Sequence, residues 1–392
     1  MADRHLVGLD IGSKYIKALQ LTGSSGQYRI TEFGVAEVSP QASVPDVVAE
    51  LFSRKSFKTK RVVTAVSGRF VFVRYISMPV MSDEELTNAA KYELGKYIPV
   101  EVEEVLHDSQ KLEELPPQEG QEPEMRVLLV AAKRTFIDEH VALLETAGLQ
   151  PHIIDVDSFA LGNAYELTGA INPQAIAPGK LVALVDIGAS KTNINIMTDA
   201  VSYFTREFYK GGDDLTDSIS KKLSLEVRDA EMLKRGAAPV SAGSPSTNVP
   251  IVMVDSADAE KLRTGSGITR GPLTSVGALP SAPSAGGGGA DADRVYECIS
   301  GIVEDICHDI NISIDYFENQ YDKKVDEIYL TGGASLTVGL QETLERTVQK
   351  PVTRWNPLQF FDQRLSAESA QELQDYASQG IIALGLASRI VG

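Results

Sequence analysis

The chain has 392 residues, of which 43% are hydrophobic and 23% are charged, and its formal net charge at pH 7 is -17. This is longer than one typical domain, so we expect two domains or a duplicated one. The negative charge repels a phosphate backbone, which argues against a nucleic-acid partner. With only Cys298 and Cys307 in the chain, a disulfide framework is not expected. No apolar run approaches the roughly 20 residues of a membrane span, so we expect a cytosolic protein.

The first residues predict three short strands, at 6–11, 16–21 and 28–38, separated by turn-forming residues. Three apolar runs separated by similar turns return at 181–208. Aligning Asp10 with Asp186 superimposes a strand, the tripeptide Asp-Ile-Gly, a short turn and a second strand. The sequence therefore predicts an internal duplication.

A small α+β module is predicted between the two copies, at 79–150. Ser82 and Glu85 have the spacing of a capping box, and an amphipathic helix follows to Tyr97. Strands are predicted at 101–112 and 125–132, joined by an acidic turn. The next helix is predicted to begin with Thr135 as its cap and to stop at Gly148.

Composition changes between residues 236 and 293, which are rich in Gly, Ser, Pro and Ala. Such a stretch cannot bury enough apolar surface to offset its ordering entropy, so we expect a largely flexible insertion. A helix is predicted at 294–318, followed by a strand that ends at Gly332. The closing segment has a single basic residue, Arg389, which favours a core helix over one lying on a membrane.

The two Asp-Ile-Gly turns suggest a shared anion site. Glycine-rich turns bring backbone N–H groups close to an anionic oxygen, because no Cβ intervenes. An aspartate before each turn, Asp10 or Asp186, can hold Mg²⁺ through water. Either motif alone is as well explained by an ordinary hairpin, but two copies in matching frames weaken that interpretation. Each turn leads into a strand, which excludes the P-loop and Rossmann designs. The residues expected near the anion are Gly12, Ser13 and Lys14 of the turn with Lys17 of the next strand in the first copy, and Gly188, Ala189, Ser190 and Lys191 in the second.

These hairpins and the late turn "LTGGAS" resemble the phosphate and adenosine motifs of the superfamily of actin, the seventy-kilodalton heat-shock chaperones and the sugar kinases. Within it, the chain resembles the PilM family of actin-like proteins from type IV pilus assembly and is similar to the FtsA family of cell-division proteins. The motifs that carry this resemblance include "GLDIGSKYIK", "LLVAAKR", "VDIGASKTNINI", "GGDDLT", "AEMLKRG" and "YLTGGASL".

The resemblance implies an α/β fold, the actin-like ATPase fold of duplicated ribonuclease-H-like domains with a small inserted module. The first lobe would comprise 1–78 and 151–178, the inserted module 79–150, and the second lobe 179–392. The implied cofactors are ATP and Mg²⁺, with the nucleotide between the lobes.

Individual roles follow from position in the motifs. Asp10 and Asp186 would hold Mg²⁺ through water, and the two turns would hold the β- and γ-phosphates. Asp157 falls where related ATPases place an acid that orients water, although Asp155 is equally near and either can simply cap the next helix. The other implied contacts are Gly211 and Gly212 at a helix N-terminus, Glu231 and Lys234 at the ribose, and Gly332, Gly333, Ala334 and Ser335 at the adenosine.

Two of these assignments have alternatives or consequences. Glu231 and Lys234 are one helical turn apart, so an ordinary surface ion pair also explains them. Ala189 and Ser190 stand where FtsA-like sequences have more glycine, and their Cβ atoms would hold a phosphate further off. We therefore expect nucleotide binding with weak or no hydrolysis.

In PilM-like proteins the inserted module and the first lobe form a groove for the N-terminal cytoplasmic segment of PilN. The resemblance implies such contacts for Tyr92, Tyr97 and the following "YIPV", unless these aromatic residues belong to the module core. It also implies a cytoplasmic scaffold that is peripheral to the inner membrane, with the pilus motor ATPases and the platform protein as further partners, and an oligomer is possible. The alternatives are an FtsA-like filament-forming ATPase and a metabolic kinase of the same superfamily, although no catalytic base and acceptor pocket are evident.

Overall fold

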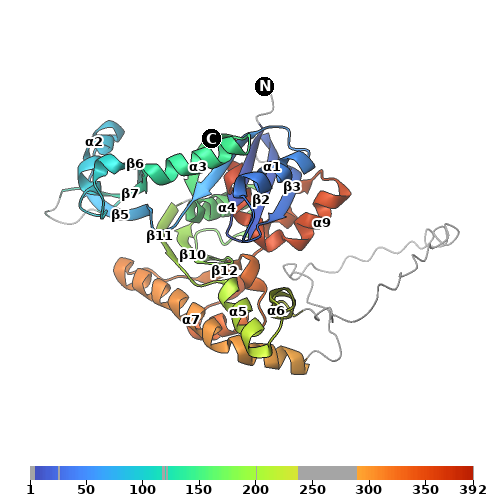
Figure 1. Cartoon of the computed structure of the whole chain (residues 1–392). Helices are drawn as coiled ribbons and strands as arrows, with labels where there is room; N and C mark the ends of the chain where they lie inside the picture. Colours follow the sequence, from blue (N-terminus) through green and yellow to red (C-terminus); the bar gives the residue numbers. More distant parts are fainter. Residues whose placement is uncertain are drawn as a thin grey trace, which may run out of the picture.

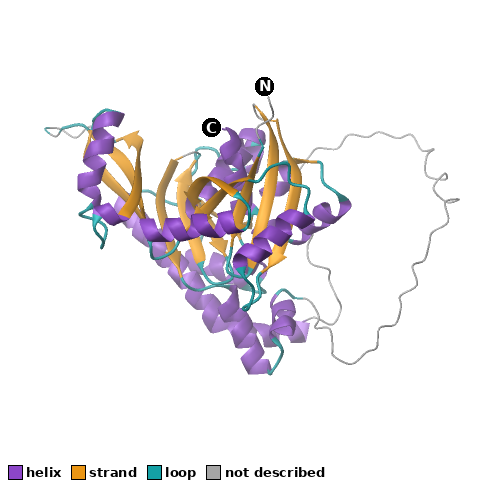
Figure 2. Ribbon diagram, turned by 45° about the horizontal axis from the view of Figure 1, so that its top comes forward, coloured by secondary structure: helices purple, strands orange, loops and turns teal. Residues whose placement is uncertain are grey.

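A computed structural model gives the fold and describes residues 5–24, 27–116, 120, 122–199, 201–236 and 289–391. Three sheets and the helices around them organise these residues (Figures 1 and 2). Most of the predicted flexible insertion at 236–293 lies outside the described residues.

The first sheet has the strand order β14-β3-β2-β1-β4-β8. Strands β1, β2 and β3 form the predicted meander, since β2 is antiparallel to both β1 and β3. Strands β1, β4 and β8 run parallel to one another. The strands are β1 (Leu6–Ile11), β2 (Tyr15–Ser24), β3 (Gln27–Glu37), β4 (Arg61–Val66), β8 (Gln150–Val156) and β14 (Asp362–Gln363).

The second sheet repeats this arrangement in the order β11-β10-β9-β12-β13. Strand β10 is antiparallel to β9 and β11, and β9, β12 and β13 run parallel. Each sheet thus contains an antiparallel meander followed by two parallel strands, which confirms the predicted duplication. The strands are β9 (Val182–Ile187), β10 (Thr192–Thr198), β11 (Val201–Phe208), β12 (Glu327–Thr331) and β13 (Val352–Arg354).

Two helices lie between the sheets. Helix α4 (Asp157–Ile171) and helix α10 (Ile381–Ala387) pack against each other and join a core cluster that contains residues of both sheets. A Cβ at Gly385 would collide with the carbonyl oxygen of Ala160, so glycine permits this close approach. Helix α10 is buried along its whole length, which confirms the predicted core helix.

Five further helices cover the outer faces of the two sheets. Apolar residues of α1 and α3 pack on the first sheet, and those of α5, α7 and α8 pack on the second. Their bounds, with those of two peripheral helices, are α1 (Val44–Arg54), α3 (Arg134–Thr146), α5 (Gly212–Leu223), α6 (Val227–Lys234), α7 (Gly289–Tyr321), α8 (Leu340–Val348) and α9 (Ala367–Asp375).

A third sheet of order β5-β7-β6 lies at one end of the molecule with α2 (Figure 1). Its elements are β5 (Val71–Pro79), α2 (Asp83–Leu94), β6 (Val105–Glu114) and β7 (Glu124–Lys133). The predicted capping box of Ser82 and Glu85 is confirmed. Tyr92 and Tyr97 are 83% and 40% exposed, so the alternative that places them in the module core is wrong.

Two local predictions need correction. The sheet of the module also includes residues 71–78, which precede the module predicted at 79–150, because β5 pairs with β7 along its whole length. Helix α3 begins at Arg134 after Lys133, and no side chain caps it, so Thr135 is not its cap. Leu144 of α3 packs in a cluster with Val7 of the first sheet. Helix α3, which falls within the predicted module, thus packs on the first sheet. The division of the chain into two lobes and a module stays a prediction.

Helix α7 begins five residues before its predicted start and ends at Tyr321. Cys298 and Cys307 both lie on it and are free. No helix in the described part of the chain is long and apolar enough to cross a membrane.

Candidate functional site

A cavity of about 660 Å³ lies where the β1–β2 and β9–β10 hairpin turns meet the turn after β12. Both lobes line it, and most of the predicted site residues come together there. Those that line it are Asp10, Gly12, Ser13, Lys14, Lys17, Asp157, Asp186, Gly188, Ala189, Ser190, Lys191, Gly212, Glu231, Lys234, Gly332, Gly333 and Ala334.

Two predicted residues, Gly211 and Ser335, do not line the cavity. The backbone N–H of Gly211 donates to Asp214 at 2.9 Å, which caps helix α5. The hydroxyl of Ser335 is buried and donates to the carbonyl oxygen of Gly332 at 2.6 Å. Both residues therefore shape the backbone beside the cavity and do not face it.

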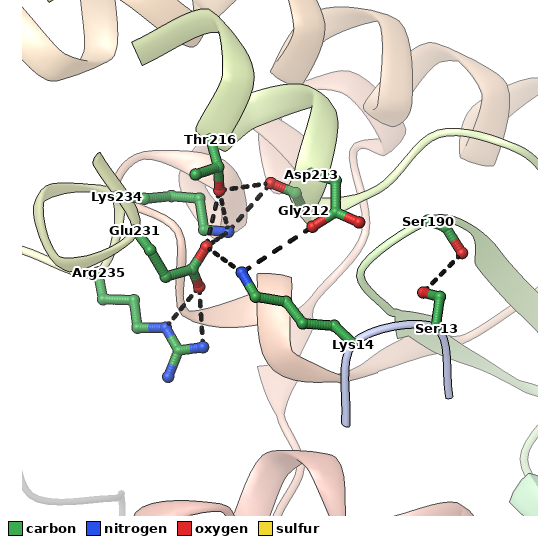
Figure 3. A network of polar contacts seen from close by, with 9 residues as sticks. All are labelled: Ser13, Lys14, Ser190, Gly212, Asp213, Thr216, Glu231, Lys234 and Arg235. Atoms are coloured by element: carbon green, nitrogen blue, oxygen red, sulfur yellow. Dashed lines mark hydrogen bonds and ion pairs between the residues drawn. The ribbon is translucent and has the colours of Figure 1, made fainter. Parts of the chain in front are cut away.

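The two hairpin turns have the same backbone geometry. The N–H of Gly12 donates to the carbonyl oxygen of Tyr15 at 3.1 Å, and the N–H of Gly188 donates to that of Lys191 at 2.9 Å. The turns also touch each other, since the hydroxyl of Ser13 donates to that of Ser190 at 3.0 Å (Figure 3). One turn from each lobe thus closes over the same cavity.

The carboxylates before the two turns have different partners. Asp10 forms an ion pair with Lys17 at 2.5 Å, and the two residues are opposite each other in the β1–β2 register. Asp186 is opposite Asn193 in the β9–β10 register, where no cationic side chain stands. Burial, together with repulsion from Asp10, raises the pKa of Asp186 to about 7. Burial also raises the pKa of Asp10, in opposition to the attraction of Lys17.

Asp157 and Asp155, which the sequence could not separate, face different surroundings. Asp157 is the first residue of α4 and lines the cavity, where its carboxylate pairs with Lys191 at 2.7 Å and accepts a hydrogen bond from Ser67 at 2.8 Å. Asp155 pairs with Arg389 at 3.2 Å and does not line the cavity. Only Asp157 of the two can therefore act on a ligand in this cavity.

Glu231 is the centre of a cationic cluster (Figure 3). Its carboxylate accepts from Lys234 at 2.7 Å, from Lys14 of the first lobe at 3.1 Å and from Arg235 at 2.9 Å. Burial alone would raise the pKa of Glu231, but these cations and a hydrogen bond from Thr216 lower it to about 2. Because the side chains of Glu231 and Lys234 are only 15% and 3% exposed, the alternative of an ordinary surface pair is wrong.

Gly332 fixes the third turn of the cavity. Its φ is +89°, and a Cβ there would approach Asp186 Oδ1 to 2.7 Å and collide with the carbonyl oxygen of Ile187. Only glycine adopts this conformation at such a distance without strain. The following residues, Gly333 and Ala334, then line the cavity with little side-chain volume.

Several lining residues were missed by sequence reasoning. Ser67, Gly68 and Arg69 reach the cavity from the β4–β5 turn, His140 from α3, and Gln379 from the segment before α10. The hydroxyl of Ser67 bonds both Asp157 and Lys191. No motif marks these residues, although "SGR" directly follows β4 and is a turn signal of the same kind as the two Asp-Ile-Gly turns.

The donor set suits a nucleotide with a divalent cation. Buried carboxylates that lack a full complement of cations favour a hard cation with oxygen ligands. The described residues contain no cluster of three or more His, Cys, Asp or Glu side chains arranged for a metal. A cation held by Asp10 and Asp186 would therefore take most of its ligands from water and phosphate oxygens, as Mg²⁺ commonly does.

Comparisons with known proteins agree with this geometry. The family model described as type IV pilus assembly protein PilM matches residues 8–240, and the model for cell division protein FtsA matches residues 183–379. The chain is similar to a solved structure described as a PilM-PilN type IV pilus biogenesis complex, with a TM-score of 0.72 and 23% identity over 99% of this chain and 98% of that chain. The predicted actin-like fold is therefore confirmed.

A curated relative gives a more partial match. Cell division protein FtsA of Streptococcus pneumoniae is 23% identical over 259 residues, which cover 58% of this chain and 54% of that protein. The match thus spans about half the length of this relative.

Proposed function

The chain belongs to the family of type IV pilus assembly protein PilM, and from this premise we propose that it is an ATP-binding scaffold that binds the cytoplasmic tail of PilN. The observation that carries the nucleotide part is the pair of matching turns, one from each lobe, that meet over one cavity. The observation that carries the partner is the similarity to the solved complex whose description names PilN.

The cavity residues divide by chemistry into parts of a nucleotide site. Backbone N–H groups of the two turns suit the β- and γ-phosphates. Glu231, with its lysines, suits the ribose hydroxyls, and the small residues Gly333 and Ala334 suit the adenine. Mg²⁺, held through water by Asp10 and Asp186, would neutralise charge on the phosphates.

Slow hydrolysis is part of the proposal. A general base must be free to accept a proton from water, whereas the carboxylate of Asp157 is already paired with Lys191 and hydrogen-bonded to Ser67. The second turn adds the Cβ atoms of Ala189 and Ser190. We expect steady-state turnover well below the value of about 10 per second that is typical of enzymes.

The proposed partner site is the junction of the module with the first lobe. Tyr92 and Tyr97 are exposed on the module, and aromatic side chains of this kind are frequent anchors of peptide binding. A hollow of about 670 Å³ lies on the side of α3 and β8, with Val141, Gly148 and Ile154 in its lining. An extended tail can lie along this surface.

A chain of hydrogen bonds connects the module with the nucleotide cavity. The hydroxyl of Tyr75 on β5 bonds Ser202 on β11 at 2.7 Å, and Ser202 donates to the side chain of Asn195 at 2.7 Å. Asn195 in turn donates to the carbonyl oxygen of Ser158 at 2.7 Å, next to Asp157. When the lobes close about a nucleotide, these contacts would transmit the movement to the module.

Through PilN, the scaffold would sit at the inner membrane and connect the nucleotide state to the pilus motor. The test is a calorimetric titration of the full chain with ATP and Mg²⁺, followed by a titration with a peptide of the PilN N-terminus. We expect a micromolar or tighter affinity for ATP and a peptide affinity that ATP changes. Absence of peptide binding in the presence of ATP contradicts the proposal.

The match to the FtsA model over residues 183–379 favours one second candidate, a filament-forming ATPase. Its test is sedimentation of the protein at micromolar concentration with ATP and Mg²⁺. Filaments in the pellet would support this candidate. Binding of the PilN peptide with an affinity that ATP changes, in the absence of filaments, supports the scaffold.

A further inference from the structure

Asn193 is a buried polar side chain whose amide nitrogen lacks a partner within the described part of the chain. It is 3% exposed, and its Nδ2 has no hydrogen-bond acceptor among the described residues. It lies on β10 opposite Asp186 and lines the main cavity. A buried amide that finds no acceptor destabilises the fold, so this donor calls for an acceptor from outside the chain.

The neighbouring Asn195 shows the contrast. It is also fully buried on β10, but its Nδ2 donates to the carbonyl oxygen of Ser158 and its Oδ1 accepts from Ser202. The fold therefore satisfies one asparagine of this strand and leaves the other, which faces the cavity, unsatisfied.

The position of Asn193 is equivalent to that of Lys17 in the first lobe. Lys17 is opposite Asp10 in the β1–β2 register, as Asn193 is opposite Asp186 in the β9–β10 register. The first lobe thus places a cation at this point, and the second lobe places a neutral donor. Both groups suit phosphate oxygens.

A second cavity indicates which end of a ligand lies beside Asn193. This side cavity of about 240 Å³ shares Ser67, Gly68 and Asn193 with the main cavity and continues between β5 and β11. Neither Glu231 nor Gly333 lines it. Asn193 is therefore at the end of the main cavity away from the residues assigned to ribose and base, which is where the terminal phosphate of a nucleotide would be.

We infer that Asn193 donates a hydrogen bond from Nδ2 to the terminal phosphate of a bound nucleoside triphosphate and so discriminates it from the diphosphate. This inference rests on the proposed function, since it assigns a residue of the same site to one phosphate. Asn193 is a specificity residue in this assignment, because a diphosphate leaves the donor as unsatisfied as it is without ligand.

The test compares Asn193→Leu with Asn195→Leu as the matched control, using the full chain with Mg²⁺. Leucine is nearly isosteric with asparagine and removes the amide. For Asn193→Leu we expect about tenfold weaker binding of ATP, less than about twofold change for ADP, and a melting temperature without ligand that is unchanged or higher. For Asn195→Leu we expect a lower melting temperature and an unchanged ratio of ATP to ADP affinity.

Asn193→Ala, which only enlarges the side cavity, serves as the second variant if the leucine variant does not fold. Equal losses for ATP and ADP, or unchanged ATP affinity with a lower melting temperature, would overturn the inference and leave ATP binding intact. If the wild-type chain binds neither nucleotide, the proposed function and this inference both fail.

Discussion

The two lobes have the same strand order but differ in charge where their hairpin turns meet. In the first lobe Lys17 pairs with Asp10 directly, whereas in the second lobe the neutral Asn193 stands opposite Asp186. The attraction of Lys17 and Lys191 for Asp186 does not outweigh its burial and the repulsion from Asp10. Burial raises the pKa of Asp186 to about 7. The first turn is therefore complete within the fold, while the second depends on a cation or ligand for its charge balance.

The lobes also differ in what connects their equivalent strands. Between β4 and β8 the first lobe carries the module sheet and α3, whereas between β12 and β13 the second lobe has a short 3-10 turn and α8. Between β3 and β4 the first lobe has helix α1, whereas between the equivalent strands β11 and β12 the second lobe has α5, α6 and α7. Glu231 and the exposed Tyr92 both lie in such unequal connections. These two proposed contact residues therefore belong to segments that only one of the two lobes contains.

The largest effect is expected from neutralising the two aspartates. Asp10→Asn and Asp186→Asn should each weaken binding of ATP with Mg²⁺ by about 100-fold or more, since both would hold the cation. Without ligand their stabilities should diverge. Asp10→Asn leaves the buried Lys17 unpaired and should cost about 3 kcal/mol of the free energy of unfolding. Calorimetric titration and thermal melts measure the two effects.

The sign for Asp186→Asn follows from its pKa. A carboxyl whose pKa in the folded state lies above its ordinary value destabilises the fold as pH rises through that pKa. Asp186→Asn should therefore raise the free energy of unfolding at pH 8 by about 2 kcal/mol or more, as a pKa of about 7 implies. Equal losses of stability in the two variants would remove the difference between the lobes.

Much of this site follows from the sequence because the motifs are local. Asp-Ile-Gly followed by a turn and a strand recurs with the same internal spacing, and each copy folds into a hairpin with the same backbone hydrogen bond. The capping box at Ser82 is equally local. Short-range patterns of this kind predict turns and helix ends well.

The remainder depends on contacts between distant segments. Ser67 becomes a site residue only because the β4–β5 turn meets α4, and Asn193 stands out only because its neighbour Asn195 finds partners that it lacks. The choice between Asp155 and Asp157 depends on where β8 ends and α4 begins. Such contacts and element boundaries are set by tertiary packing, and a single sequence does not reveal them.

The second prediction tests the long connection that carries Glu231. The pKa of Glu231 is lowered to about 2, so the stability that its ionised form contributes is present above pH 4.5 and is lost as pH falls towards 2. This should cost up to about 3 kcal/mol of the free energy of unfolding. Burial lowers the pKa of Lys234, but that lysine stays protonated throughout this range and does not change the slope.

Denaturant unfolding at several pH values compares the wild type with Glu231→Gln. We expect the variant to be less stable near neutral pH and the difference to shrink below pH 4. A constant difference across this range would mean that the charge of Glu231 does not stabilise the connection.

The third prediction concerns the module, which only the first lobe carries. Tyr92→Ala should weaken binding of a PilN N-terminal peptide by about tenfold, as for an aromatic anchor, and leave the melting temperature unchanged because Tyr92 is 83% exposed. Tyr316→Ala is the matched control, since Tyr316 is 55% exposed on α7 of the second lobe. Fluorescence anisotropy with a labelled peptide measures both. Similar losses in the two variants would place the partner elsewhere.

The smallest effect is expected at the contact between the module and the second lobe. Tyr75→Phe removes the hydroxyl that bonds Ser202, the first link between β5 and β11. ATP would then still close the lobes, but less of its effect would reach the module, so the change that ATP causes in peptide affinity should fall by about threefold, within the usual range of coupling free energies.

Tyr296→Phe is the control for this last prediction, because the hydroxyl of Tyr296 bonds Thr343 at 2.8 Å inside the second lobe. Both variants lose one tyrosine hydrogen bond, which typically contributes about 1 kcal/mol to stability, so their melting temperatures should fall alike. Only Tyr75→Phe should alter the ratio of peptide affinities with and without ATP. If both variants keep the wild-type ratio, the nucleotide signal does not reach the module through the hydroxyl of Tyr75.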